Sequence, residues 1–312
     1  MFAATHDRER IRLHAHQRHD VEIYTFGALP NRYAVWHQNA WFDALRGYAS
    51  PDDARQNITR RFASAKLSPF PCRLRHGRYR FNGTAHHIDK HMADGHALHG
   101  LLYDAEFAVY RIGTNADGAW AGLRHDYGGS AGYPFPYRID ILYTLNQQGL
   151  SVQTDITNTG HAPLPLADGW HPYFTLGGCA DDWTLQLHAR RRLRFDAELL
   201  PTGDTLDDHR FAEPASLRGA TLDDCFVRTD PAADTPACTL HSQDFTLNIY
   251  ACAAYPFIQV YLPPERDALA LENLSGAPDC FNNGIGRITL PTGDTRRFTV
   301  RYDLTYQAQS PT

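Results

Sequence analysis

Hydrophobic and polar residues alternate along much of the chain, in the pattern that half-buried β-strands require. In RFTVRYDLTY, residues 297–306, the apolar side chains of Phe298, Val300, Tyr302 and Leu304 alternate with polar ones. The same alternation recurs in YRIDILYTL, LSVQTDI, WTLQLHA and FTLNIYA, and stretches such as NQQG and TNTGHAP supply turns between strands. A period of two between turns predicts antiparallel strands. The sequence therefore predicts an all-β protein, built as a large antiparallel β-sandwich.

Helical spacing of apolar residues is confined to short stretches. In SPDDARQNITRRFASAK, Ser50 is suited to cap a helix and Pro51 to open it, and acidic residues follow in the first turn. Ala54, Ile58 and Phe62 then recur at helical spacing. We expect one helix here and a second, short helix in NAWFDALRGY.

Neither a low-complexity linker nor a short repeat divides the chain. A length of 312 residues is compatible with two domains, but an all-β protein of this size can form one unit. A content of 43% hydrophobic and 21% charged residues is that of an ordinary globular protein. We expect a single domain over residues 1–312.

The net charge argues against two classes of partner. A formal charge of −5 gives no basic excess for binding nucleic acid or an anionic membrane. No apolar run approaches the roughly 18 residues of a membrane span, and the first twenty residues lack the apolar core of a signal peptide. We expect a protein that binds neither nucleic acid nor membrane.

The cysteines are scattered and form no CxxC pair. In a chain this large they are best explained as reduced core residues of a cytoplasmic protein, although disulfides in an exported form are an alternative. The six cysteines are Cys72, Cys179, Cys225, Cys238, Cys252 and Cys280.

With 17 histidines in the chain, a single histidine is weak evidence for a site. HAHQRHDVE resembles the HxH and Glu metal ligands of cupins, but the spacing from His16 to Glu22 does not fit and no glycine leads into it. HHIDKHMADGHALHG has no fixed ligand spacing and no thiolate partner. We expect a polar N-terminal strand in the first segment and no metal site in either.

Two further groups of residues have an ordinary and a functional interpretation. The basic clusters RLRHGRYRF and ARRRLR are best explained as solvated strand faces, and a phosphate contact is the alternative. His171 stands in DGWHPYFTL among aromatic and turn residues. Taken alone it is a core histidine with a satisfied hydrogen bond, and a proton-transfer group is the alternative.

Several short strings, taken in order, change that balance. SPFPCRLRHGRYRFNG is followed by ALHGLLY with His99, DGWHPYFTL with His171, TLDDCFV with Asp223, and LALENLSGAPDCFNNG with Glu272. In this order they resemble the aldose 1-epimerase (galactose mutarotase) family. The resemblance runs from about Leu67 to the C-terminus.

The resemblance implies a fold, an activity and a site. Family members are large antiparallel β-sandwiches whose open, curved face holds a sugar. By this likeness His171 is the general acid and Glu272 the general base. Arg73, His99 and Asp223 fall on sugar-binding positions. The resemblance implies a monosaccharide substrate and neither a metal nor an organic cofactor.

The reaction explains why these residue types are needed. Opening a cyclic aldose removes a proton from the anomeric hydroxyl, which suits a carboxylate, and adds one to the ring oxygen, which suits an imidazolium. With ordinary pKa values of about 4.3 for Glu and 6.5 for His, both forms are accessible near neutral pH. A neighbouring carboxylate such as Asp223 would favour the charged form of His171 if it lies close.

Alternatives to a free-aldose mutarotase stay open at this point. One is a mutarotase for a phosphorylated or acidic sugar, and another is a non-catalytic sugar-binding protein with the same fold. A glycosidase using Asp223 and Glu272 is weaker because it leaves His171 without a role. Cys72 and Trp170 stand where many relatives have Asn, and both are expected beside the pocket, so the identity of the sugar is open. The oligomer is expected to be a monomer or a homodimer.

Overall fold

The computed structural model describes residues 1–231 and 234–306. Three antiparallel sheets dominate it, and the largest has nine strands. Its strands, in spatial order, are β12 (Ala108–Thr114), β13 (Gly118–Tyr127), β14 (Tyr137–Asn146), β15 (Gly149–Asn158), β29 (Thr295–Tyr306), β25 (Phe245–Ala251), β24 (Cys238–His241), β19 (Thr184–Leu187) and β22 (Ala215–Ser216). Buried and partly exposed residues alternate strictly along β14, as the sequence predicts for a strand with one face in the core.

The second sheet has eight strands and carries the candidate site. Its strands, in spatial order, are β21 (Pro201–Asp207), β20 (Ala189–Phe195), β23 (Asp223–Arg228), β26 (Phe257–Tyr261), β27 (Leu269–Leu274), β17 (Gly169–His171) and β6 (Ala65–Leu67), with β18 (Tyr173–Phe174) also paired to β27. The WTLQLHA segment is divided between two sheets, because β19 ends before His188 and β20 begins after it.

The third sheet is N-terminal and has five strands in chain order. They are β1 (Phe2–Asp7), β2 (Arg10–Ala15), β3 (His19–Tyr24), β4 (Pro30–His37) and β5 (Ala40–Asp43). Smaller pairings involve β7 (Arg73–Leu74), β8 (Arg78–Phe81), β9 (Thr84–His87), β10 (Met92–Ala93), β11 (His96–Leu98), β16 (Leu164–Leu166) and β28 (Ile288–Leu290).

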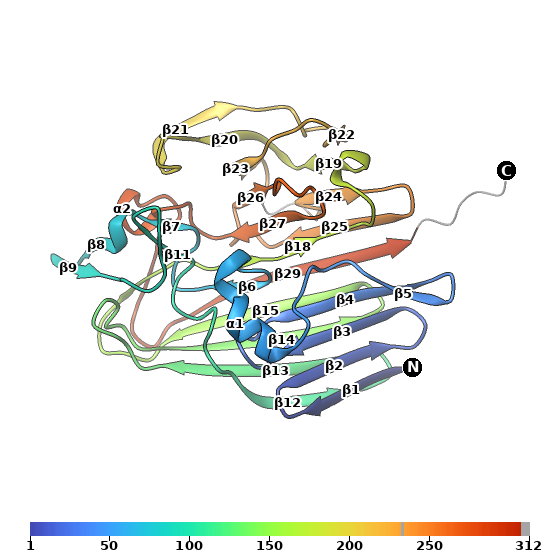
Figure 1. The fold of residues 1–312 in the computed structure, drawn as a ribbon. Helices are drawn as coiled ribbons and strands as arrows, with labels where there is room; N and C mark the ends of the chain where they lie inside the picture. Colours follow the sequence, from blue (N-terminus) through green and yellow to red (C-terminus); the bar gives the residue numbers. More distant parts are fainter. Residues whose placement is uncertain (232–233, 307–312) are drawn as a thin grey trace.

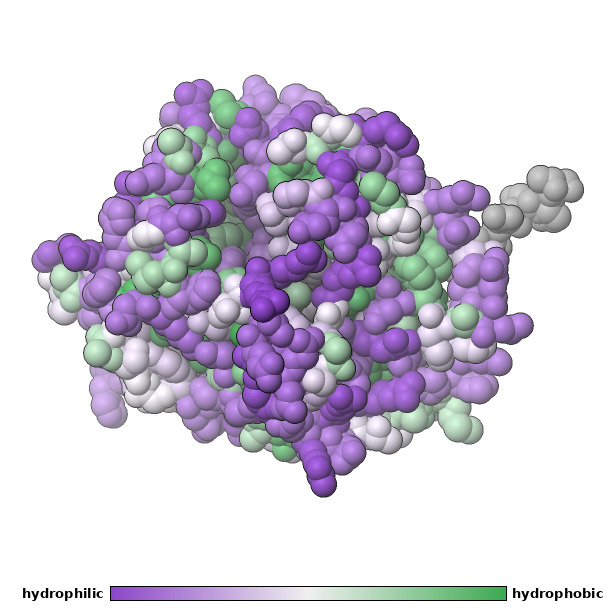
Figure 2. All heavy atoms as spheres, in the orientation of Figure 1, coloured by the Kyte–Doolittle hydropathy of each residue, from purple (hydrophilic) through white to green (hydrophobic). Residues whose placement is uncertain are grey.

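The nine-stranded sheet packs against both other sheets. The ring of Phe174 lies 5.4 Å from that of Tyr302 in β29, and Trp170 lies 6.2 Å from Tyr143 in β14. Strands β1 and β2 of the N-terminal sheet contact β13, below α1 in Figure 1. The apolar side chains are mostly inside, and the face in Figure 2 is mainly hydrophilic. The predicted all-β sandwich is thus confirmed, and a single domain over 1–312 stays a prediction.

One of the two predicted helices is present. Helix α1 (Pro51–Arg61) begins after Ser50, whose side chain accepts a hydrogen bond from the Asp53 amide at 3.1 Å. It ends where Phe62 adopts a left-handed conformation, with φ of 53°. The apolar residues Ala54 and Ile58 are buried, as the helical spacing predicts.

The prediction of a second helix in NAWFDALRGY is wrong. Gln38 and Asn39 both have positive φ, 47° and 63°, which forms a tight turn between β4 and β5. The chain therefore doubles back, and Trp41 pairs with Trp36 across two strands. The other α-helix of the described residues is the short α2 (Cys280–Asn283), for which the sequence has no helical pattern of apolar residues.

The cysteines agree with the expectation of free thiols. All six are unpaired, and four of them are buried: Cys72, Cys225, Cys238 and Cys280. In the part of the chain that the structure describes, no helix is both long and apolar enough to cross a membrane.

Candidate active site

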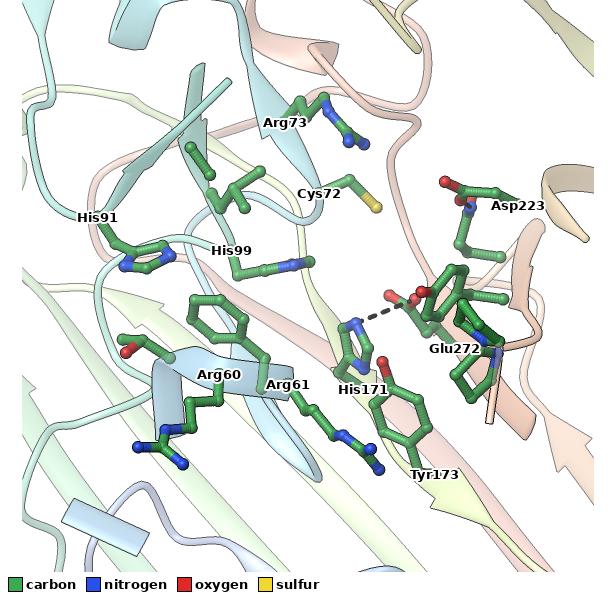
Figure 3. Close-up of a pocket in the computed structure, with 18 of the residues that line it drawn as sticks. Arg60, Arg61, Cys72, Arg73, His91, His99, His171, Tyr173, Asp223 and Glu272 are labelled. Carbon is green, nitrogen blue, oxygen red and sulfur yellow. Dashed lines mark hydrogen bonds and ion pairs between the residues drawn. The ribbon is translucent and has the colours of Figure 1, made fainter. Parts of the chain in front are cut away.

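Two titratable side chains meet on the eight-stranded sheet. Nε2 of His171, the last residue of β17, lies 3.3 Å from Oε1 of Glu272 in β27 (Figure 3). Only 6% of His171 and 2% of Glu272 are exposed to solvent. A nitrogen and a carboxylate oxygen at this distance can exchange a proton directly.

Strand register explains why residues a hundred positions apart come together. Gly169 pairs with Leu274 on β27, and Tyr173 pairs with Ala270 on the same strand. The residue midway on one strand is His171, and the residue midway on the other is Glu272. Residues opposite each other in an antiparallel pair project from the same face of the sheet, so the register itself brings the two side chains into contact.

The other three predicted site residues line the same cavity, whose volume is about 480 Å³. Arg73 begins β7, His99 follows β11, and Asp223 begins β23. Figure 3 shows Arg73, His99 and Asp223 around the His171–Glu272 pair. The structure thus brings all five predicted residues together.

Cys72 also lines the cavity. The expectation that Trp170 does so is wrong, because Trp170 projects from the other face of β17 and packs near Tyr143.

Local backbone geometry aims His99 at the pair. The residue has a positive φ of 60°, and its amide donates to the carbonyl of Cys72 at 2.9 Å. Its ring meets that of His171 edge to face, with centroids 5.0 Å apart. Burial lowers the pKa of His99 well below its usual value, and the neighbouring His171 lowers it further, so the His99 ring is neutral.

Burial shifts the acid and the base in opposite directions. It lowers the pKa of His171 to about 4. It raises the pKa of Glu272 well above its usual value, and the charge of Asp223 raises it further. Desolvation therefore favours the neutral form of each group in the empty cavity. When the pair holds one proton, that proton lies between two groups only 3.3 Å apart.

The expectation that Asp223 would hold His171 in its charged form is wrong. The carboxylate in contact with His171 is Glu272, while Asp223 accepts a hydrogen bond from Nε2 of Gln259 at 2.7 Å. The pKa of His171 is lowered because burial dominates. Asp223 acts on the other partner, since its charge favours a protonated Glu272.

Sequence comparison agrees with this geometry. The family model described as aldose 1-epimerase matches residues 9–303. The chain belongs to the aldose 1-epimerase family. YihR of Escherichia coli K12, described as an uncharacterized protein, is 30% identical over 241 residues, which cover 74% of this chain and 75% of YihR. The family-model match begins at residue 9, well before Leu67, so it also covers β2 to β5 of the N-terminal sheet.

Solved structures of the family share the fold. A galactose mutarotase-like protein from Clostridium acetobutylicum superposes with a TM-score of 0.87 at 14% identity, covering 98% of this chain and 99% of that one. A galactose 1-epimerase from Lactobacillus acidophilus superposes with a TM-score of 0.81 at 17% identity, covering 99% of both chains. These similarities confirm the mutarotase-like β-sandwich.

The cavity also contains residues that the sequence pattern did not identify. Gln259 lies opposite Glu272 in the β26–β27 pair, is 5% exposed, and its Oε1 has no hydrogen-bond partner among the described residues. It is the single polar residue of FIQVY, a signal that could have marked it. Arg60 and Arg61 reach the rim from the end of α1 (Figure 3), and nothing in the helical pattern indicated this.

The basic clusters are mainly solvated and paired, as expected. In RLRHGRYRF only Arg73 lines the cavity, and Arg75 instead pairs with Asp196 at 3.1 Å. In ARRRLR, Arg192 pairs with Asp208 at 3.1 Å, away from the cavity.

The histidine-rich segments form strands and turns. HAHQRHDVE lies in the β2–β3 hairpin, where Nδ1 of His14 is 3.2 Å from Oδ1 of Asp20. Asp20 also accepts from Arg12 and Arg32, so arginines occupy its oxygens. Over residues 1–231 and 234–306, no group of three or more His, Cys, Asp or Glu side chains is arranged to hold a metal ion.

Proposed function

We propose that this protein interconverts the α and β anomers of an aldose by acid–base opening and closure of the sugar ring. Membership in the aldose 1-epimerase family supports a carbohydrate isomerase. The observation that carries the proposal is the buried His171–Glu272 pair, 3.3 Å apart at the wall of a cavity of about 480 Å³. This pair can move one proton off a sugar oxygen and another onto a neighbouring one.

Ring opening begins from the charged form of the pair. The carboxylate of Glu272 accepts the proton of the anomeric hydroxyl, and the imidazolium of His171 donates one to the ring oxygen. The bond from C1 to the ring oxygen breaks, its electron pair goes to that oxygen, and C1 becomes an aldehyde. Rotation about C1–C2 followed by the reverse transfers closes the other anomer. The bonds broken and formed stay within the sugar and nothing is oxidised or reduced, so the proposed reaction needs no cofactor.

Burial helps the opening step. Once the ring is open, Glu272 holds the proton and His171 is neutral, which is the distribution that desolvation favours in this cavity. The charged form from which ring opening begins is stabilised by the attraction between the two groups at 3.3 Å. Acid–base catalysis by positioned groups of this kind contributes roughly 10²–10⁴-fold.

The surrounding side chains are suited to hold the sugar. Arg73 can donate to hydroxyls, and Asp223 and Oε1 of Gln259 can accept from them. The ring of Tyr173 lies 5.1 Å from that of His171 and forms an apolar wall beside it. Fixing the sugar in this way aligns its reacting oxygens with the acid and the base.

The test is anomer exchange on a panel of freshly dissolved hexoses, pentoses and sugar phosphates, followed by polarimetry or saturation-exchange NMR. Wild-type protein is expected to accelerate exchange of at least one sugar. Glu272→Gln and His171→Ala are expected to lose most of that rate while remaining folded. Glu198→Gln is a control, because that glutamate lies outside the cavity and pairs with Arg75 at 3.3 Å. No acceleration across the panel refutes the proposal.

One observation favours a second candidate, a mutarotase for a sugar that carries an anionic group. Arg60, Arg61 and Arg73 all line the cavity, and only Arg61 is in an ion pair with a described residue, at 3.3 Å from Glu265. Arginine is suited to bind phosphate and carboxylate. A higher kcat/KM for charged sugars, lost in Arg60→Gln, would identify this function. Thermal stabilisation by sugars without exchange would instead identify a non-catalytic sugar-binding protein.

A further inference from the structure

A complete ion pair is buried behind the strand that carries His171. Nζ of Lys66 lies 2.6 Å from Oδ1 of Asp168, and neither side chain is exposed to solvent. The other carboxylate oxygen of Asp168 accepts from the hydroxyl of Tyr255 at 2.6 Å. Lys66 also donates to the carbonyl of Gly169 at 3.2 Å. The proposed reaction makes no use of either charge.

Net stability does not account for this pair. Burial lowers the pKa of Lys66 and raises the pKa of Asp168, which shows that desolvation is the dominant effect on both charges. Replacing a buried ion pair by uncharged side chains of similar volume is often neutral or stabilising. The pair therefore calls for an explanation in terms of geometry.

Its position gives that explanation. Lys66 lies opposite Trp170 in the β6–β17 pair, and Ala65 lies opposite His171. Because side chains alternate along a strand, Lys66 and Trp170 project from the face opposite to His171. Nζ of Lys66 lies 4.5 Å from the centre of the Trp170 ring. The ammonium group thus fixes the back of the strand whose front carries the acid.

Asp168 connects that strand to the strand of the base. Its amide donates to Oγ of Ser275 at 2.7 Å, and the amide of Ser275 donates to the Asp168 carbonyl at 2.8 Å. Asp168 is three residues before His171, and Ser275 is three residues after Glu272. The side chain of Asp168 is thus joined to β6, and its main chain to the end of β27.

We propose that Lys66 and Asp168 form a positioning pair that sets the distance between His171 and Glu272. The pair and the hydrogen bonds of Asp168 hold β6, β17 and β27 together, three residues away from His171 and Glu272 along their strands. This inference rests on the proposed function for its kinetic test, but the geometry it asserts can be measured without substrate.

The first test replaces both charges at once. Lys66→Met/Asp168→Asn removes the ion pair and keeps an oxygen for the hydroxyl of Tyr255. We expect kcat to fall about 10- to 100-fold with KM within about twofold of wild type, since small misplacement of catalytic groups has costs of this size. A folded double variant with wild-type kcat overturns the proposal. A change in KM alone does so as well, because it indicates a binding role.

A second variant keeps the test decisive if the double variant does not fold. Ser275→Ala removes one hydroxyl from the link to β27 and should lower kcat several-fold at unchanged KM. Its matched control is Ser242→Ala, which removes a buried hydroxyl that accepts from the Phe245 amide at 3.2 Å, away from the site. Equal kcat in the two serine variants overturns the proposal.

The last measurement separates this inference from the proposed function. The NMR chemical shifts of the His171 imidazole, recorded without sugar, report on its contact with Glu272. They should change in Ser275→Ala and not in Ser242→Ala. If wild-type protein is inactive on all sugars while this change is observed, the mutarotase proposal fails and the positioning pair stands. If the wild-type protein is active but the His171 signal is unchanged in Ser275→Ala, the mutarotase proposal stands and the positioning pair is overturned.

Discussion

Replacing His171 by glutamine should make the protein more resistant to acid while removing its activity. The folded state holds the pKa of His171 at about 4, whereas the unfolded chain has the ordinary value of 6.5. Between these values the unfolded state binds more protons than the folded state. The contribution of the neutral His171 to wild-type stability is therefore fully present above pH 6.5 and is lost as the pH falls toward 4.

The size of the effect follows from the two pKa values. At pH 5 the ring is almost fully protonated in the unfolded chain and mostly neutral in the folded one. This difference lowers the free energy of unfolding by about 2 kcal/mol relative to pH 8. His171→Gln cannot take up that proton, so its stability should change by about 2 kcal/mol less between the two pH values.

The chain offers a matched control in His19. Burial lowers the pKa of His19 to about 4 as well, and this residue lies in β3, outside the cavity. Urea unfolding at pH 8 and pH 5 should therefore show the same relief of acid sensitivity in His19→Gln and His171→Gln. Only His171→Gln should lose anomer exchange, by roughly 10²–10⁴-fold. If His171→Gln retains the acid sensitivity of wild type, the imidazole is not held neutral and the reasoning is refuted.

Three further predictions follow from the same contacts. Glu272→Gln should gain stability relative to wild type as the pH rises above about 4.5, because the raised pKa of Glu272 makes its ionisation destabilising. Urea midpoints at pH 4 and pH 7 test this, and an equal change of the midpoint in both proteins contradicts it. The exchange rate should fall below about pH 4, because His171 and Glu272 are then both protonated and no base remains. Initial rates from pH 3.5 to 9 test this, and a flat profile contradicts it. Ser50→Ala should destabilise the protein by about 1 kcal/mol through loss of the α1 cap, and an unchanged urea midpoint would count against this.

Periodicity was sufficient to predict the class of fold but not all of its elements. The strict alternation of β14 and the capping signals at Ser50 are local, so both could be predicted from the chain. The error at residues 39–48 arose because the turn at Gln38 and Asn39 depends on positive φ values that the residue types only permit. Pairing with β4 then makes Ala40–Asp43 a strand.

The candidate site was only partly accessible from the sequence. The short strings around His171 and Glu272 identified the residues, and the register of β17 and β27 accounts for their contact. Gln259 and Arg60 were missed because their place at the cavity depends on which strand or helix end lies beside it. Such neighbours are set by tertiary packing, which a pattern along one segment does not encode.

Electrostatics is where the structure changes the chemistry most. With ordinary pKa values, the expected resting state near neutral pH is a carboxylate at Glu272 beside a readily protonated His171. Burial acts against this state, because it disfavours both charges and, when the pair holds one proton, favours Glu272 over His171 as its site. That distribution is the one that follows ring opening in the proposed reaction. Burial therefore stabilises the protonation state of the open-chain intermediate relative to that of the ring-closed complex.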